Sequence, residues 1–419
     1  MDDLKSRWMQ LDRQIATWWR GDMKQATESE ILDPEMNKVW FSEEEADKRK
    51  KPVEPTLLFL PFPYVSGAGS KEAFPEMYCW DSYFINWGLL HHKQTETVRK
   101  HLLNHLFLVL RFGMVLNGNR TYYTTRSQTP LLAQDVWRYY EHSKDTELLY
   151  FAYPLLKKQY TGYWDADHHR TPIGLTTNRD LGDPGLRPEL AAEAEILDFT
   201  PIFGGDVRNC VPIMTNCALV AYTDVLAKIA ERIGLKDEAE HWKKSSSTRK
   251  ALINQYCWDP DRAFYFEYNY VTGQPLEHYS FCAYWTLWAG VADTAQAEAL
   301  VAQLDRIECA HGVTITDRIY ESPHPEFDWL QFQYPAGWPP MQMIIVEALK
   351  RYGYTNEAER IAEKFLRLML RIYEETGELW EKYNVVDGSL ELPIERYKTQ
   401  PFHGWSSAAI ADLGRTLFK

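Results

Sequence analysis

The chain has 419 residues, of which 45% are hydrophobic and 25% charged, a composition typical of a globular protein with a sizeable core. Its 46 Lys and Arg residues stand against 59 Asp and Glu residues, and the resulting net charge of −13 disfavours nucleic acid and anionic membranes as partners. No stretch approaches the roughly 18 uninterrupted apolar residues of a membrane span, so we expect no membrane segment.

Apolar residues recur at the i, i+3, i+4, i+7 spacing of helices along the whole chain. The pattern predicts twelve helices, at roughly 4–20, 81–91, 94–113, 130–142, 145–167, 211–233, 236–256, 278–291, 294–306, 340–352, 355–376 and 403–416. Short polar turns such as GLKDEAEHW join several of them, and turns of this kind make successive helices antiparallel neighbours. Long connections rich in Gly, Pro, Trp and Tyr are expected at about 51–80, 114–129, 168–210, 257–277, 307–339 and 377–402.

Two architectures bury both faces of such helical hairpins: an open α-solenoid and a closed (α/α)6 toroid. The connections vary in length and lack a strict repeat, which favours the toroid. Helix 4–20 is expected to pair with helix 403–416 and to close the ring. The sequence therefore predicts an all-α single domain over residues 1–419, with the long connections forming the active site at one end of the ring.

The six cysteines are scattered singly without a CxxC pair, so reduced thiols are expected. The first residues, MDDLKSRWMQ, lack the regions of a signal peptide, and we predict a cytoplasmic location. DADHHR at 165–170 contains metal-ligand residue types but has no second cluster to match, so we interpret it as a solvated helix end. Since P-loop, GxGxxG and GxSxG motifs are also missing, we expect neither a metal nor another cofactor.

Three connections contain unusual segments: AFPEMYCWDSYF at 73–84, NGNRTYYTTRSQTP at 117–130 and QFQYPAGWPPMQ at 331–342. Their order and spacing resemble the signatures of trehalases and of glycoside hydrolase family 63, which shares the trehalase catalytic domain. The resemblance runs from about residue 60 to residue 410. It implies an (α/α)6 domain that hydrolyses α-glycosides with inversion.

Inverting hydrolysis needs one carboxylic acid and one carboxylate base on opposite faces of the sugar. The resemblance implies that Asp180, in TNRDLGDPGLRPEL, is the general acid, with Asp183 as the alternative. Either aspartate could instead stabilise a turn. The resemblance implies that Glu381, in ELWEKYN, is the base. The competing glutamates nearby are Glu378, Glu391 and Glu395.

The resemblance also implies a hexose pocket with fixed polar groups over an aromatic floor. The residues at the matching positions are Tyr78, Trp80, Asp81, Asn117, Arg126, Gln128, Gly337, Trp338 and Trp380. Two of them have a structural alternative, because Asp81 could cap helix 81–91 and Arg126 could pair with a surface carboxylate.

The sequence departs from the trehalase pattern at Ala73, where the signature has an arginine, and at Phe332 and Gln333, where it has Trp and Asp. These departures favour the bacterial mannosylglycerate and glucosylglycerate hydrolases of the family 63 group, with a small anionic glycoside as substrate and trehalose as the alternative. A glycerate carboxylate needs a cation, and Arg208 stands just before the positive end of helix 211–233.

Other expectations remain open beside this one. Arg120, Arg179 and Arg187 are further cations in the right connections, and Tyr334 and Tyr270 could hydrogen-bond the leaving group. A salt bridge with Asp206 or Asp183 is the structural alternative for Arg208. A non-enzymatic helical binding scaffold and a histidine-dependent epimerase or lyase are the remote alternatives. A homo-oligomer is compatible with the sequence.

Overall fold

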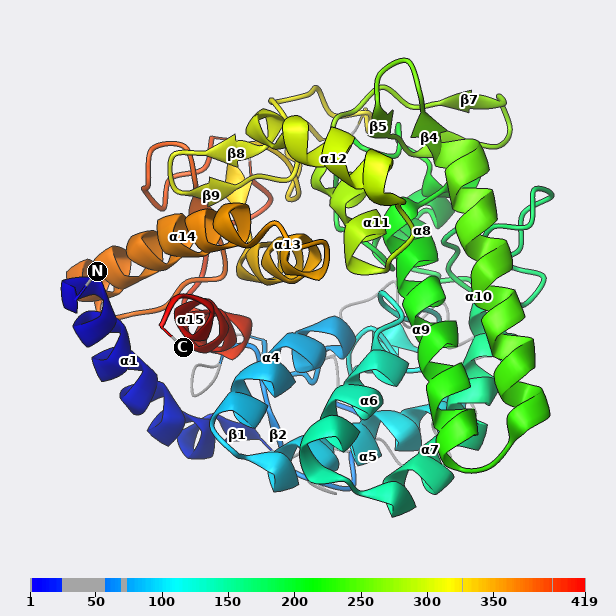
Figure 1. The fold of residues 1–419 in the computed structure, drawn as a ribbon, viewed down its shortest axis with the longest axis horizontal. Helices are drawn as coiled ribbons and strands as arrows, with labels where there is room; N and C mark the ends of the chain where they lie inside the picture. The colour runs from blue at the N-terminus through cyan, green and yellow to red at the C-terminus, as the bar shows by residue number, and fades with distance from the viewer. Residues whose placement is uncertain (1, 25–56, 69–73, 326, 394, 419) are drawn as a thin grey trace.

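Inner and outer helices build the molecule, which is represented by a computed structural model that describes residues 2–24, 57–68, 74–325, 327–393 and 395–418 (Figure 1). The inner helices are α4 (Cys79–His91), α6 (Leu132–Ser143), α9 (Ile213–Arg232), α11 (Trp285–Trp288), α13 (Pro339–Arg351) and α15 (Gly404–Leu417). The outer helices are α1 (Asp2–Gly21), α5 (Thr95–Phe112), α7 (Thr146–Gln159), α10 (Lys236–Cys257), α12 (Thr294–Ala302) and α14 (Thr355–Thr376).

The inner helices form a closed ring. Each contacts the next in the order α4, α6, α9, α11, α13, α15, and α15 contacts α4 again. The first helix, α1, contacts both α14 and α15, so the two ends of the chain meet as the toroid requires (Figure 1). The predicted (α/α)6 architecture and the pairing of the first and last helices are confirmed.

Side-chain chemistry explains which helices lie inside. α4 is buried along nearly its whole length because apolar and aromatic residues occur on every side of it. α14 instead carries its buried residues on one stripe and charged residues on the other. Local signals fix several ends: Asp293 and Gln296 form a capping box before α12, and Gly113 and Gly377 end α5 and α14 with positive φ angles of 81° and 75°.

All twelve predicted helices are present, with differences at three places. The segment 278–291 contains only a 3-10 turn, Phe281–Tyr284, followed by the short α11. The helix predicted over 145–167 ends in a π-helical turn, Tyr160–Trp164. A short additional helix, α8 (Pro188–Glu193), lies within the long connection 168–210. The remaining 3-10 turns are Thr121–Tyr123, Val207–Asn209 and Leu304–Arg306.

Short antiparallel strands tie the connections together. The pairs are β1 (Met23–Lys24) with β2 (Tyr64–Val65), β3 (Cys210–Val211) with β6 (Tyr268–Asn269), β6 with β7 (Gln274–Pro275), β4 (Trp258–Asp259) with β5 (Phe264–Tyr265), β8 (Glu308–Cys309) with β9 (Gly312–Val313), and β10 (Ala336–Gly337) with β11 (Tyr383–Asn384). In the last pair, Gly337 lies opposite Tyr383, so strand pairing joins the third motif, residues 331–342, to the segment that follows Glu381.

One described helix, α9, has the length and apolar composition of a membrane span. It is largely buried and contacts α6, α10 and α11, as a core helix of the ring does. All six cysteines are free, and five of them are buried, in agreement with the prediction of reduced thiols.

Candidate active site

A cavity of about 640 Å³ is lined by the segments that lead into the inner helices. These segments precede α4, α6, α9, α13 and α15, so the cavity lies at the end of the ring where the long connections gather, as predicted. Its lining residues are Phe74, Tyr78, Trp80, Asp81, Asn117, Tyr122, Tyr123, Arg126, Gln128, Leu186, Leu190, Ala194, Ile196, Asp198, Phe199, Phe327, Trp329, Gln331, Phe332, Trp338, Glu381, Arg396, Tyr397, Phe402 and Trp405.

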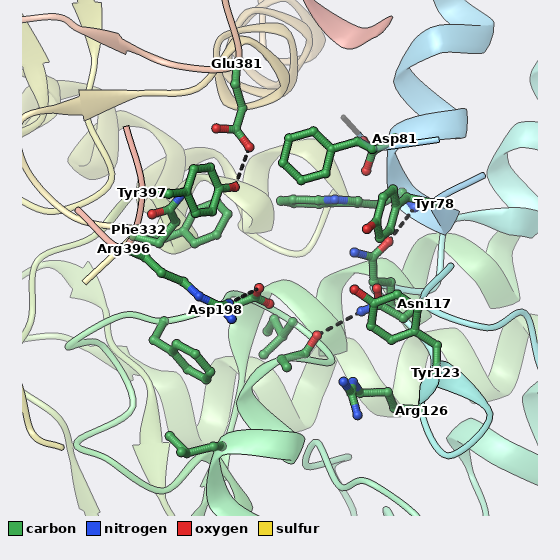
Figure 2. A pocket seen from close by; sticks show the side chains of 18 of the residues that line it. Tyr78, Asp81, Asn117, Tyr123, Arg126, Asp198, Phe332, Glu381, Arg396 and Tyr397 are labelled. Carbon is green, nitrogen blue, oxygen red and sulfur yellow. Dashed lines mark hydrogen bonds and ion pairs between the residues drawn. The ribbon is translucent and has the colours of Figure 1, made fainter. Parts of the chain in front are cut away.

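The first two motifs hold the start of α4 against the cavity. The backbone N–H of Trp80 donates to Oε1 of Gln128 at 3.0 Å, and the N–H of Cys79 donates to the carbonyl of Asn117 at 2.9 Å. Because α4 begins at Cys79, two residues earlier than predicted, Asp81 lies inside its first turn and is not the cap. Its carboxyl group faces the cavity (Figure 2), and burial together with the negative charge of Glu381 raises its pKa well above the usual value.

The aromatic floor comes from the third motif and from α15. The rings of Phe332 and Trp338 stack with their centroids 4.2 Å apart, and Trp405 packs edge-on against Trp338 at 5.9 Å. Phe332 therefore remains part of the cavity wall, although it replaces the tryptophan of the trehalase pattern. Gly337, the residue before Trp338, packs closely against Val385, since a Cβ there would lie 2.1 Å from Cγ1 of Val385.

Glu381 presents one free oxygen to the cavity. Its side chain is buried, and Oε1 accepts a hydrogen bond of 2.7 Å from the hydroxyl of Tyr397. Oε2 has no hydrogen-bond partner among the described residues. Burial raises the pKa of Glu381 to about 7, against the opposing effects of the neighbouring Lys382 ammonium and the Tyr397 hydroxyl.

Asp198 faces Glu381 from the opposite side of the cavity (Figure 2). Two contacts fix the segment that carries it: the N–H of Thr200 donates to Oε1 of Glu193 at 2.7 Å, and the N–H of Phe332 donates to the carbonyl of Phe199 at 2.9 Å. Desolvation raises the pKa of Asp198, although Arg396 and Arg126 partly oppose the shift. The negative charge of Asp198 also contributes to the raised pKa of Glu381.

Asp180 does not face Glu381 and is not among the lining residues. Its oxygens accept hydrogen bonds from the N–H of Gly182 at 2.6 Å and from the Thr125 hydroxyl at 2.8 Å. Asp183 likewise bonds the N–H of Gly185 and the guanidinium of Arg126, at 2.7 and 2.5 Å. Both aspartates therefore occupy the turn-stabilising role that the sequence left open for them.

Asp198 is an acidic lining residue that the sequence argument did not consider. Asp198 and Asp180 stand in the same long connection, 168–210, and each follows a bulky residue, Leu197 and Arg179. The backbone between the two positions folds so that only the later aspartate reaches the cavity.

Arg208 is also placed differently from the prediction. Its guanidinium forms two hydrogen bonds with the carboxylate of Asp206, at 2.8 and 2.7 Å, and it does not line the cavity. Tyr270 donates its hydroxyl proton to the carbonyl of Arg208 and is held outside the cavity by this contact. The salt bridge that was the alternative for Arg208 is therefore the arrangement observed.

Several other predicted positions lie outside the lining. Gly337 belongs to β10, the indole N–H of Trp380 donates to the Thr376 hydroxyl at 3.1 Å, and the N–H of Tyr334 donates to the Thr316 hydroxyl at 2.9 Å. The further cations have partners of their own: Arg120 with Glu76, Arg187 with Glu189 and Arg179 with Tyr270. Ala73 lies outside the described residues.

The DADHHR segment follows the π-helical turn and is solvated in part, as predicted, since Asp167 and Arg170 are exposed. His169 departs from the prediction, because it is fully buried and contacts Oε2 of Glu195 at 3.1 Å, while its other ring nitrogen contacts the carbonyl of Tyr163 at 2.9 Å. Within the ranges that the structure describes, no three His, Cys, Asp or Glu side chains gather as metal ligands would.

The comparisons with known proteins agree with this architecture. The cytosolic neutral trehalase of Kluyveromyces lactis is 28% identical over 401 residues, covering 81% of this chain and 53% of that protein, and the periplasmic trehalase of Pseudomonas aeruginosa is 28% identical over 413 residues, covering 87% and 73%. The chain thus spans about half the length of the first of these relatives.

Solved structures show the same fold. The neutral trehalase Nth1 of Saccharomyces cerevisiae superposes with a TM-score of 0.82 at 22% identity, covering 99% of this chain and 94% of the other. The mannosylglycerate hydrolase of Thermus thermophilus superposes with a TM-score of 0.62 at 18% identity, covering 84% and 95%.

The family profile described as "Trehalase" matches residues 7–188 and 199–415. Asp198 lies in the short gap between these two stretches, so its assignment depends on the geometry of the cavity. The match covers most of the sequence, and the chain therefore belongs to the trehalase family of glycoside hydrolases.

Proposed function

We propose that this chain hydrolyses a small α-linked disaccharide with inversion, and that trehalose is the first substrate to test. The observation that carries the proposal is the placement of Asp198 and Glu381, which lie on separate connections and face one cavity from opposite sides (Figure 2). Inverting glycosidases need this arrangement, because acid and base act on opposite faces of the sugar. The trehalases among the sequence relatives support trehalose.

Mannosylglycerate or glucosylglycerate is the second candidate substrate. The similarity in fold to a mannosylglycerate hydrolase supports it, and so does an arginine, Arg396, at the rim of the cavity. Both candidates have a hexose joined by an α-linkage to a small leaving group.

The polar end of the cavity suits the hexose. Asp81, Asn117 and Gln128 lie at the start of α4 or in contact with it, and Trp338 lines the same cavity. Buried hydrogen-bonding groups held by secondary structure give the fixed geometry that recognition of hydroxyl groups requires.

The reaction then follows from the two carboxyl groups. We assign Asp198 as the acid that protonates the leaving oxygen while the bond between that oxygen and the anomeric carbon breaks. Glu381 takes a proton from water as the water oxygen bonds to the opposite face of the same carbon. The Tyr397 hydroxyl holds Oε1 of Glu381, and Oε2 is left to accept the water proton.

Other classes of function have less support. A non-enzymatic scaffold would not need two carboxyl groups facing one pocket. A histidine-dependent epimerase or lyase would need an imidazole in the site, and no histidine occurs among the described residues that line the cavity. A cytoplasmic location stays a prediction.

The test is release of hexose from trehalose, mannosylglycerate and glucosylglycerate, with the anomer of the product followed by NMR. Inversion predicts that the β-anomer appears first from the two glycosylglycerates, and that trehalose gives α- and β-glucose in equal initial amounts, because only one of its two anomeric carbons is attacked. Initial release of the α-anomer alone, or no hydrolysis of any of the three, would contradict the proposal.

Activated substrates assign the two roles. A fluoride leaving group needs little protonation, so Asp198→Asn is expected to retain far more activity on α-glucosyl fluoride than on the disaccharide, while Glu381→Gln loses about 10²–10⁴-fold on both. Asp180→Asn is the matched comparison, since that side chain holds a turn and keeps an acceptor oxygen after substitution. If Asp180→Asn shows the dependence on the leaving group and Asp198→Asn does not, the roles of the two aspartates are exchanged.

A further inference from the structure

Arg396 differs from the other cavity residues because its positive charge is only partly neutralised by nearby carboxylates. The cavity is lined by two cationic side chains within the described part of the chain, Arg126 and Arg396. Arg126 is buried and contacts the carboxylates of both Asp180 and Asp183, at 3.3 and 2.5 Å. Its charge is therefore already balanced by the protein.

Arg396 has one carboxylate partner in the described ranges, Asp198, at 3.5 Å between Nη1 and Oδ2. Its side chain is 47% exposed. The guanidinium also lies over the rings of Phe199 and Trp329, 5.8 and 5.5 Å from their centroids, and these rings hold it at the rim of the cavity. Figure 2 shows it reaching toward Asp198.

Protonation of Asp198, which a general acid requires, removes the charge that faces Arg396. The guanidinium then lies at the cavity without a charged carboxylate partner among the described residues. A second anion would restore the balance, and a substrate bound in the cavity can supply it.

We infer that Arg396 binds an anionic group on the leaving-group side of the substrate, so that this chain prefers α-glycosides whose leaving group carries a carboxylate or a phosphate. The inference rests on the proposed function, because it takes Asp198 as the residue that protonates the leaving oxygen. On this assignment Asp198 and the adjacent Arg396 face the leaving group, and we place the hexose toward the other lining carboxyl group near α4, that of Asp81.

Two matched substrate pairs test the inference. Glucosylglycerate against glucosylglycerol tests a carboxylate, and trehalose 6-phosphate against trehalose tests a phosphate. We expect kcat/KM to be about tenfold higher for the anionic member of at least one pair, a modest ratio because the arginine is half exposed. Preference in one pair only identifies which anion the site takes.

For each variant we measure the ratio of kcat/KM within each substrate pair. A loss of activity that affects both members of a pair equally leaves this ratio unchanged. Arg396→Gln is expected to abolish the preference and Arg396→Lys to keep part of it. Arg208→Gln is the matched control, because that arginine is bound to Asp206 outside the cavity, and it is expected to keep the full preference. Calorimetric binding of each pair to Glu381→Gln gives a second readout that does not depend on turnover.

The possible outcomes distinguish failure of the inference from failure of the proposed function. Equal kcat/KM within both pairs for the wild-type chain, or an unchanged preference in Arg396→Gln, overturns the inference and leaves the proposed function standing. Loss of the preference in Arg208→Gln but not in Arg396→Gln would return the anion site to Arg208. Failure to hydrolyse any of the four compounds and mannosylglycerate would overturn the proposed function and the inference together.

Discussion

The buried charge of Glu381 is expected to lower the stability of the fold and to serve catalysis, and replacing the residue by glutamine tests both effects. The carboxyl group is buried, and its pKa rises from the ordinary 4.5 to about 7. A raised pKa in the folded state means that ionisation opposes folding. Stability is therefore highest below the unfolded pKa, falls as pH rises from 4.5 toward 7, and stays lower above it.

The magnitude follows from the two pKa values. At pH 8 the ionised carboxylate costs up to about 3 kcal/mol of unfolding free energy, whereas at pH 5 it costs about 1 kcal/mol or less. Glutamine removes the charge and keeps an oxygen that can accept the hydrogen bond from the Tyr397 hydroxyl. Glu381→Gln is therefore expected to be more stable than the wild type at pH 8 and nearly equal at pH 5. For a chain of 419 residues, this corresponds to a rise in Tm of about 3 °C at pH 8.

Thermal unfolding of both proteins at pH 5 and pH 8, at one scan rate, measures the effect. The same samples are assayed for hexose release, which is expected to fall by about 10²–10⁴-fold. Glu391→Gln is the matched control, since Glu391 is exposed and lies on the same connection. A variant of Glu381 that is equally stable or less stable at pH 8, or that hydrolyses substrate at near wild-type rate, would refute the reasoning.

Three further predictions concern the same site. With a neutral substrate, the acid limb of kcat/KM should lie near pH 7, because Glu381 must lose its proton to act as base, and activity that is constant down to pH 5 would contradict this. Gly337→Ala should lower the unfolding free energy by about 1–3 kcal/mol in denaturant titration, because its Cβ would lie 2.1 Å from Val385. Adding a second change, Val385→Ala, should restore most of the lost unfolding free energy. His324→Ala should lower kcat about tenfold with little change in KM, because the buried imidazole contacts Glu193, which holds the segment that carries Asp198. His324→Gln should recover activity. Equal losses of kcat in both variants would contradict a positioning role for His324.

The ring was predictable because its signals are local. Apolar periodicity marks each helix by itself, and short polar turns such as the one before α10 define neighbours without any knowledge of distant contacts. The positions of Trp80, Asp81 and Glu381 followed from the resemblance of short motifs, and all three line the cavity.

The choice between Asp180 and Asp198 was not predictable in this way. Both stand in one long connection, and backbone contacts that come from other elements decide which of them reaches the cavity. Arg208 was misplaced because the sequence cannot rank its possible partners. Asp206, two residues away, supplies both oxygens and removes the arginine from the site.

The closed contact circuit of the inner helices has a consequence for how this family member can change. Asp198 and Glu381 belong to segments that enter α9 and α15, which stand at different points of the circuit. The separation of the two carboxyl groups therefore depends on how the inner helices pack as well as on the contacts within the connections. Side chains buried between the inner helices, far from the cavity, thus help to position the two groups on which the proposed reaction depends.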